Sequence, residues 1–139
     1  MNRTLSPATD ANSQRIVLVV EDEILVRSIT SEFLRDSGYT VLEATNAAEA
    51  ISILASGTTI DIVFSDIELH DATMDGIGLA QWVSEHYPDV QVMLTSGNGY
   101  AAHTAEKVAF LRKPYCVTEA LDRIMALLVG DRRTTSNQD

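Results

Sequence analysis

The sequence has one cysteine and no long apolar run, and each shortage narrows the kinds of protein it can encode. The single Cys116 excludes an internal disulfide and a cysteine-rich metal site. No apolar run approaches the roughly 18–20 residues that a membrane span needs. The polar start of the chain also lacks the apolar segment of a signal peptide. We therefore expect a cytoplasmic protein that does not enter a membrane.

Basic residues are scarce as well. The 10 Lys and Arg residues stand against 20 Asp and Glu residues, which gives a formal net charge of −10. A surface that binds nucleic acid needs clustered Lys and Arg to meet the phosphates, and an anionic membrane attracts the same residues. Neither nucleic acid nor a membrane is therefore an expected partner.

The length and composition indicate one globular domain. The chain has 139 residues, of which 45% are hydrophobic, and this length suffices for one domain with a real core. Residues 1–14 and 131–139 are polar and are expected to be flexible tails. No repeat or linker interrupts the segment between them. We expect a single domain over about residues 15–130, with no attached output domain.

Five short apolar runs are typical of strands. Those nearest the sheet centre should be apolar almost throughout, because strands of a parallel sheet are covered on both faces. The predicted strands are Ile16–Val20, Thr40–Ala44, Ile62–Ser65, Val90–Thr95 and Val108–Leu111.

Helical patterns lie between these runs. Leu25, Ile29 and Phe33 form a stripe with helical spacing, and Gly38 follows as a stop. Three further helices are predicted at Ala47–Ala55 after an Asn46 cap, at residues 79–87 before Pro88, and at residues 121–128 after a Thr118 cap.

The segment Asn98–Lys107 gives the weakest helical pattern, because Gly97 and Gly99 flank its start and its apolar residues are mostly alanine. Repeated alternation of strand and helix predicts a doubly wound α/β fold. We expect a five-stranded parallel sheet flanked by about five helices, of which the fourth is weak.

Polar side chains follow three of the predicted strands at the points where they end. Glu21 and Asp22 follow the first strand, Asp66 the third, and Thr95 and Ser96 lie at the end of the fourth. Such sheets bind ligands beyond the carboxyl ends of their central strands, so these side chains should converge. Three clustered carboxylates repel one another without a cation, and oxygen ligands suit Mg²⁺.

A lysine near the end of the fifth strand completes this arrangement. In the stretch "LRKPY", Lys113 could reach an anion at the acidic cluster as a mobile point charge. The hydroxyl of Thr95 or Ser96 could donate to the same anion. A carboxylate, a metal, an ammonium group and a hydroxyl together make a site suited to phosphoryl transfer.

With these residues in view, the sequence resembles the receiver domain of two-component response regulators. The resemblance spans about residues 15–130 and depends on four separated motifs in order: "VVEDE", "VFSDIEL", "VMLTSG" and "FLRKPY". It implies a flavodoxin-like receiver fold.

The resemblance implies a role for each acid. Asp66 would accept the phosphoryl group and, with Asp22, bind Mg²⁺ directly. Glu21 would assist the ion through water, and Glu68 would offer its backbone carbonyl. Lys113 would pair with the phosphoryl group.

The resemblance also implies a switch. Thr95 would move toward the phosphoryl group while Phe110 turns inward, and this would change the face built from the fourth helix, fifth strand and fifth helix. The peptide bond to Pro114 is expected to be cis.

The implied partners are proteins. A sensor histidine kinase or a histidine phosphotransfer protein would supply the phosphoryl group. Either an unknown downstream protein would receive the signal, or the chain would act as a relay or phosphate sink among kinases. Homodimerisation through the switch face is a further expectation. No enzymatic activity is expected beyond Mg²⁺-dependent self-phosphorylation and autodephosphorylation.

The chain departs from the family pattern after the acceptor. The loop "DIELHDATMDG" is about two residues longer than usual, lacks the customary proline, and carries His70 and Asp71 instead. Glu68 places an acidic side chain beside the phosphoryl site.

Two other functions remain open. The chain could be a pseudo-receiver, whose fold serves as an interaction surface without phosphorylation. It could also be a small Mg²⁺-dependent aspartyl phosphatase, because Glu68 supplies the acid that such enzymes carry two residues after the nucleophile.

Overall fold

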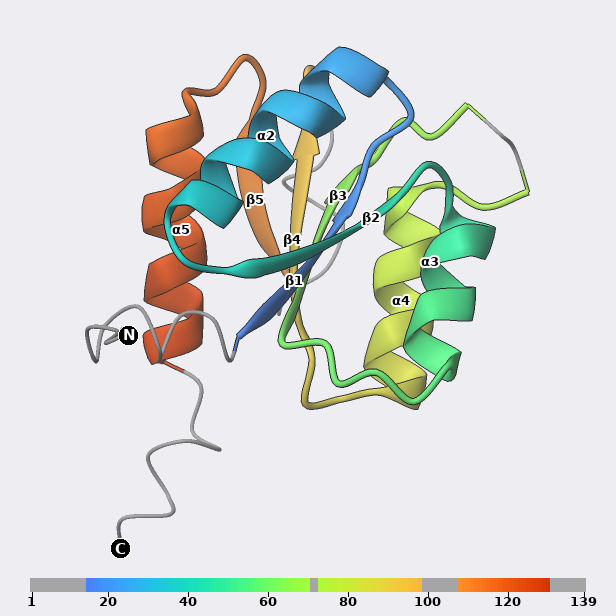
Figure 1. Ribbon diagram of the computed structural model, residues 1–139. Helices are drawn as coiled ribbons and strands as arrows, with labels where there is room; N and C mark the ends of the chain where they lie inside the picture. The colour runs from blue at the N-terminus through green and yellow to red at the C-terminus, as the bar shows by residue number, and fades with distance from the viewer. Residues whose placement is uncertain (1–14, 71–72, 99–107, 131–139) are drawn as a thin grey trace, which may run out of the picture.

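The computed structural model describes residues 15–70, 73–98 and 108–130 of the chain. Within these ranges, five strands alternate with four helices (Figure 1). The elements are β1 (Ile16–Val20), α2 (Ile24–Asp36), β2 (Thr40–Ala44), α3 (Ala47–Ala55), β3 (Ile62–Asp66), α4 (Gly76–His86), β4 (Gln91–Ser96), β5 (Ala109–Arg112) and α5 (Val117–Val129).

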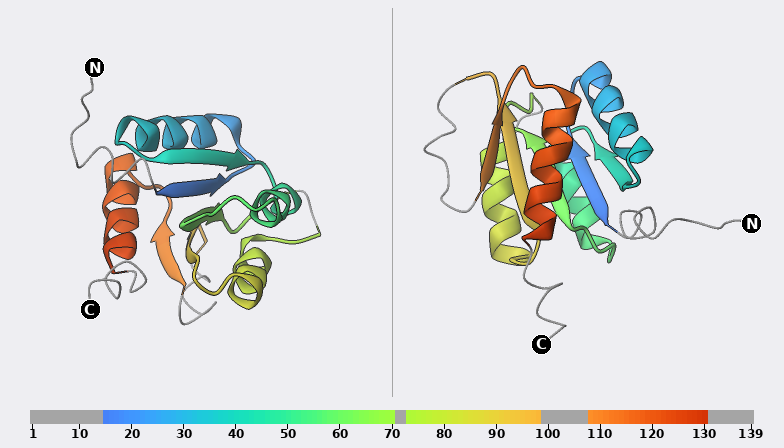
Figure 2. Two further views of the ribbon diagram at one scale, coloured as in Figure 1. Left: turned by 60° about the horizontal axis from the view of Figure 1, so that its bottom comes forward. Right: turned by 90° about the vertical axis from the view of Figure 1, so that its left-hand side faces the viewer.

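The strands form one parallel sheet in the order β2-β1-β3-β4-β5. Helices α2 and α5 cover one face, and α3 and α4 cover the other (Figures 1 and 2). The predicted doubly wound α/β sheet is therefore confirmed. Four of the five expected helices lie in the described part of the chain, whereas the weak one at 98–107 falls almost wholly outside it, as do the two predicted tails.

The core consists of two apolar layers, one on each face of the sheet. In β1, Val17 and Val19 contribute to the layer under α2 and α5, while Leu18 and Val20 contribute to the layer under α3 and α4. All four side chains are buried. The continuous apolar run in β1 exists because both of its faces are covered.

The apolar stripe predicted for helix α2 does not coincide with the buried side of that helix. Leu25 and Ile29 are 72% and 59% exposed, whereas Thr30, Ser31 and Leu34 are buried. Thr30 can be buried because its hydroxyl shares a 3.0 Å hydrogen bond with the hydroxyl of Tyr115. The helix is present as predicted, but its apolar stripe partly faces solvent.

The helix ends follow local chemistry. The Asn46 side chain accepts a 2.8 Å hydrogen bond from the Glu49 backbone at the start of α3, as predicted. The predicted Thr118 cap is wrong: α5 begins earlier, with Cys116 as its N-cap residue. Gly38 follows α2 with a φ of 105°, a conformation that glycine adopts easily. No helix within the described ranges is long and apolar enough to span a membrane.

Candidate functional site

The predicted acids meet at the carboxyl edge of the sheet. Glu21 and Asp22 follow β1, and Asp66 is the last residue of the neighbouring strand β3. One carboxylate oxygen from each of the three lies within 4.8 Å of the others. Glu21 and Asp66 are buried, at 3% and 5% exposure. Buried carboxylates this close repel one another, so the cluster is suited to a cation.

Lys113 supplies the first positive charge. Its Nζ lies 3.1 Å from Oδ2 of Asp66 and 3.4 Å from Oε1 of Glu21. Its backbone N–H donates a 3.0 Å hydrogen bond to the carbonyl of Ser96, which ties the loop after β5 to the end of β4. The bond from Lys113 to Pro114 is cis, as the family resemblance implies.

The electrostatics of these groups are strongly perturbed. Burial, and then the charge of Asp66, raises the pKa of Glu21 to about 7. Burial also raises the pKa of Asp66, although Lys113 offsets part of this effect. Burial works to lower the pKa of Lys113, but the two carboxylates outweigh it and the pKa is raised. One ammonium group therefore does not neutralise the cluster.

Asp22 has two differently placed oxygens. Oδ2 accepts a 3.0 Å hydrogen bond from the backbone N–H of His70 and a short one from its ring Nδ1. Oδ1 is buried and has no hydrogen-bond partner among the described residues. Burial works to raise the pKa of Asp22, but the bonds from His70 outweigh it and lower the pKa. An ionised carboxylate with one unsatisfied buried oxygen fits a hard cation.

Thr95 lies beside the acceptor. It is the register partner of Asp66 across the β3–β4 ladder. Its Oγ1 is buried and has no partner within the described ranges. Because an unpaired buried hydroxyl costs free energy, this site favours the arrival of an acceptor group such as a phosphoryl oxygen.

Glu68 points along the edge of the sheet toward β4. Its Oε2 accepts hydrogen bonds from the Ser96 hydroxyl at 2.7 Å and from the Asn98 side chain at 2.9 Å. Its backbone N–H donates a 3.3 Å hydrogen bond to Oδ1 of Asp66. Ser96, one of two candidate hydroxyls, therefore binds Glu68. The role of the Glu68 carbonyl stays a prediction.

Phe110 is the second residue of β5. It is half-buried, lies opposite Leu94 in the β4–β5 register, and packs against the core layer under α3 and α4. Its carbonyl accepts a 3.0 Å hydrogen bond from Arg123 of α5. The described contacts are those of a packing residue, and its switching role stays a prediction.

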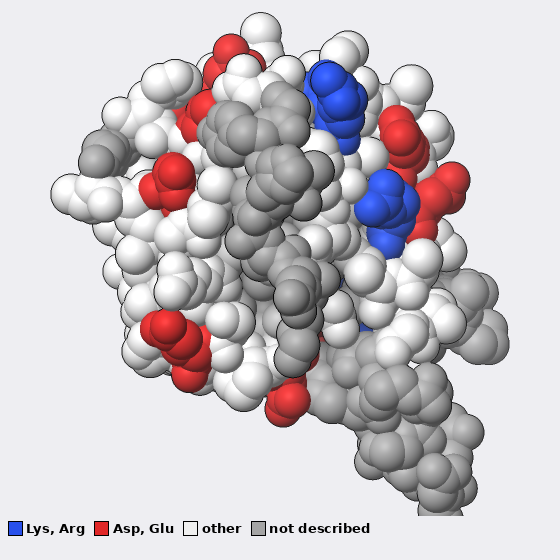
Figure 3. Space-filling view, turned by 180° about the vertical axis from the view of Figure 1, so that it is seen from behind, with Lys and Arg blue, Asp and Glu red and all other residues white. Residues whose placement is uncertain are grey.

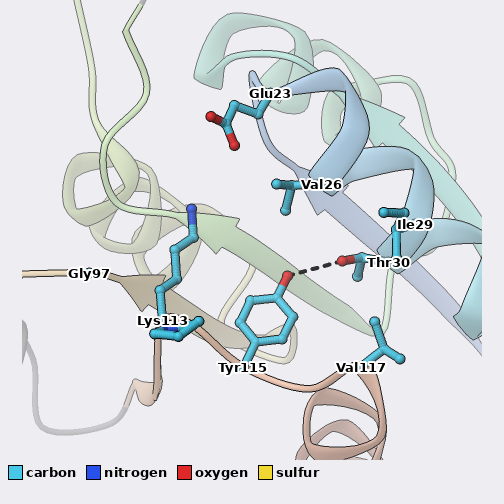
Figure 4. Close-up of a pocket in the computed structure, with 9 residues that line it drawn as sticks. Glu23, Val26, Ile29, Thr30, Gly97, Lys113, Tyr115 and Val117 are labelled. Atoms are coloured by element: carbon cyan, nitrogen blue, oxygen red, sulfur yellow. Dashed lines mark hydrogen bonds between the residues drawn. The ribbon is translucent and has the colours of Figure 1, made fainter.

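A pocket of about 610 Å³ opens beside the acidic cluster (Figure 4). Val26 and Ile29 of α2 and Val117 of α5 give it apolar walls, and the side chain of Lys113 runs along the left side of the view. The hydrogen bond between Thr30 and Tyr115 crosses its floor. An apolar surface thus adjoins the acceptor.

Sequence reasoning missed the contacts of His70 and Tyr115 with the site. His70 lies in the loop that departs from the family pattern, and Tyr115 lies two residues after Lys113. The unusual loop was a signal for His70, but no spacing rule connects that residue to Asp22. The partner of Tyr115 is likewise on a distant element, α2.

Comparison with known proteins identifies the family. The family described as "Response regulator receiver domain" matches residues 17–125. Sensor kinase CckA of Brucella abortus is 32% identical over 132 residues, which are 91% of this chain and 14% of that protein. The chain spans less than a fifth of the length of the first curated relatives it matches.

Solved structures agree. A response regulator receiver protein from Sinorhizobium medicae has a TM-score of 0.77 and 26% identity, over 84% of this chain and 96% of that one. Response regulator protein TrrA from Thermotoga maritima, in complex with Mg²⁺-BeF, has a TM-score of 0.74 and 26% identity, over 82% of this chain and 99% of that one. This chain therefore belongs to the receiver domains of two-component signalling.

Proposed function

We propose that this chain is a phosphorylation-switched signalling protein that accepts a phosphoryl group on Asp66 from a histidine kinase or a histidine phosphotransfer protein. The observation that carries the proposal is the environment of Asp66. Its buried carboxylate has Lys113 at 3.1 Å, two further acids within 4.8 Å, and the unpartnered Thr95 hydroxyl beside it in the described structure.

Each side chain has a task in the transfer. A carboxylate oxygen of Asp66 attacks the phosphorus of a phosphohistidine, the phosphorus–nitrogen bond breaks, and the imidazole leaves with its electron pair. The ammonium of Lys113 pairs with the transferred oxygens, and the hydroxyl of Thr95 donates to one of them. Phosphorylation removes the negative charge of the Asp66 carboxylate, and the negative phosphoryl oxygens take its place as the partner of Lys113.

Glu21, Asp22 and Asp66 would hold Mg²⁺, with the carbonyl of Glu68 as a further ligand. The ion would offset both the repulsion among the acids and the negative charge of the incoming group. The three oxygens within 4.8 Å and the unpartnered Oδ1 of Asp22 support this assignment. Kinship with a receiver crystallised with Mg²⁺-BeF supports the choice of metal.

The proposed phosphoryl donor docks beside α2. The exposed side of this helix carries Ile24, Leu25 and Ile29, at 64%, 72% and 59% exposure. Ile29 also lines the pocket that leads to Lys113. An apolar surface next to the acceptor suits a helical partner that presents its histidine to Asp66. Similarity to a sensor kinase supports this class of partner.

The proposed output is contact with another protein through Thr95 and Phe110. Nucleic acid is disfavoured by the net charge of −10. Among the described residues on the face of Figure 3, acidic side chains are scattered and basic ones form no broad patch. We also propose homodimerisation through the face of β5 and α5; the predicted fourth helix, which would belong to this face, lies almost wholly outside the described residues. Sedimentation showing a monomer with and without phosphorylation would exclude the dimer.

Phosphorylation distinguishes this proposal from a pseudo-receiver, which would lack an acid, the hydroxyl or the lysine. An independent phosphatase is disfavoured because Oε2 of Glu68 already accepts hydrogen bonds from Ser96 and Asn98. No reaction on external substrates is therefore proposed. Turnover of a generic phosphomonoester, lost in Asp66→Ala, would revive the phosphatase.

Intact-mass measurement after incubation with acetyl phosphate tests the proposal. One phosphoryl adduct is expected for the wild type with Mg²⁺ and none with chelator or for Asp66→Ala. Asp89→Asn removes an exposed acid outside the cluster and should still form the adduct. An adduct that persists in Asp66→Ala, or is indifferent to chelator, would refute the proposal.

A further inference from the structure

His70 lies where this chain departs from the family pattern, four residues after Asp66 in the loop that follows β3. Its side chain is 80% exposed, so burial does not hold it in place. What holds it is Asp22: the backbone N–H and the ring Nδ1 of His70 both bond to Oδ2 of that carboxylate. The loop after β3 thus binds Asp22, which follows the neighbouring strand β1.

These hydrogen bonds leave the two carboxylate oxygens of Asp22 in different environments. Oδ2 is satisfied by two N–H donors, whereas Oδ1 is buried and unpartnered among the described residues. Rotation about the last torsion of an aspartate is broad and nearly twofold, so an untethered carboxylate samples many orientations. Fixing one oxygen fixes the direction of the other.

We propose that His70 is a positioning residue for the cation site, which holds Oδ2 of Asp22 so that Oδ1 is presented to Mg²⁺. The inference rests on the proposed function, which supplies the cation. Hydrogen bonds to ligating carboxylates orient them, and losing such a partner typically costs about 10–100-fold in metal affinity. His70 would orient Asp22 from a position that is exposed to solvent.

Two other roles for His70 fit the contacts less well. As a metal ligand it would need a ring nitrogen in the cluster, but Nδ1 is already engaged with Asp22. As a competitor of the metal it would need to occupy the oxygen that the metal requires. The bonds from His70 leave Oδ1 of Asp22 open, so Asp22 can bind the histidine and the cation at the same time.

Metal affinity tests the inference without any phosphorylation. We would titrate the protein with Mn²⁺, a stand-in that favours the same oxygen ligands, and follow the unbound ion by electron paramagnetic resonance at one fixed pH. His70→Ala should weaken Mn²⁺ binding about tenfold. His70→Asn, whose amide can donate in place of Nδ1, should restore part of the loss. The melting temperature in chelator should be the same for all three proteins.

His86→Ala provides the matched control. His86 is an exposed histidine on α4 that stacks on Trp82 and makes no contact with the acidic cluster in the described residues. Its removal should leave Mn²⁺ affinity unchanged. Electron spin echo spectra of the wild-type complex should show no directly bound nitrogen.

Three results would overturn the inference: unchanged affinity in His70→Ala, tighter binding in that variant, or a nitrogen bound directly to Mn²⁺ in the wild type. Any of these leaves the proposed function standing if the wild type binds Mn²⁺ and gains a phosphoryl adduct. A wild type that binds no Mn²⁺ and forms no adduct overturns both.

Discussion

Replacing Asp66 by asparagine should make the metal-free protein more stable. The substitution removes one of three neighbouring carboxylate charges while keeping the size of the side chain. Lys113 does not lose all its partners, because its Nζ remains 3.4 Å from Glu21. The wild-type site is strained by its own charge until a cation arrives, so removing a charge should relieve it.

The size of the expected gain in stability can be estimated from the pKa of Glu21. A rise from 4.5 to about 7 corresponds to about 3 kcal/mol against the ionised carboxylate in the fold. Burial is the larger cause and the charge of Asp66 the second, so relief from Asp66→Asn should be about 1 kcal/mol at pH 8. For a domain of this size that raises the melting temperature by about 4 °C.

Calorimetry in chelator and in Mg²⁺ checks this reasoning. In chelator at pH 8 the variant should melt above the wild type, and the gap should shrink at pH 5.5, where Glu21 is protonated. Saturating Mg²⁺ should reverse the order, because an ion at 100 times its Kd adds about 2.7 kcal/mol to the protein that binds it. A variant that melts well below the wild type in chelator would refute the account of carboxylate repulsion.

Three further predictions concern the same edge of the sheet. Stability in chelator should fall by up to about 3 kcal/mol between pH 4.5 and 7, because native Glu21 keeps a proton that the unfolded chain has released; Glu21→Gln should reduce this fall in urea titrations and leave the part that the raised pKa of Asp66 contributes. Gly76→Ala should cost about 2 kcal/mol, since its Cβ would lie 2.3 Å from the Asp66 carbonyl oxygen; unchanged urea stability would contradict this. Thr95→Val should gain about 1 kcal/mol in chelator by removing an unpaired buried hydroxyl, and a measured loss would count against it.

The centre of the sheet was predictable because β1, β3 and β4 are buried on both faces. The bounds of β1 and β2 match their apolar runs, while β4 is displaced by one residue to Gln91–Ser96. There the ladder includes a polar residue at each end, which an apolar pattern cannot indicate. The convergence of Glu21, Asp22 and Asp66 was predictable for the same reason, since adjacent parallel strands end at one edge.

The contacts between loops were not predictable. His70 reaches Asp22 and Glu68 reaches Ser96 through loop conformations that no periodicity specifies. The buried side of α2 was hidden for a related reason. Thr30 faces inward because Tyr115, on a distant segment, satisfies its hydroxyl, so a polar residue takes a place where the pattern favours an apolar one.

The central claim is that Asp66, its acidic neighbours and Lys113 form a Mg²⁺-dependent phosphoryl site. The most direct test is ¹⁹F nuclear magnetic resonance of beryllofluoride, a phosphoryl mimic that needs no long-lived phosphoaspartate. We expect bound fluorine signals for the wild type and Asp89→Asn with Mg²⁺, and none with chelator or for Asp66→Ala. Bound signals in Asp66→Ala, or none for the folded wild type with Mg²⁺, would contradict it.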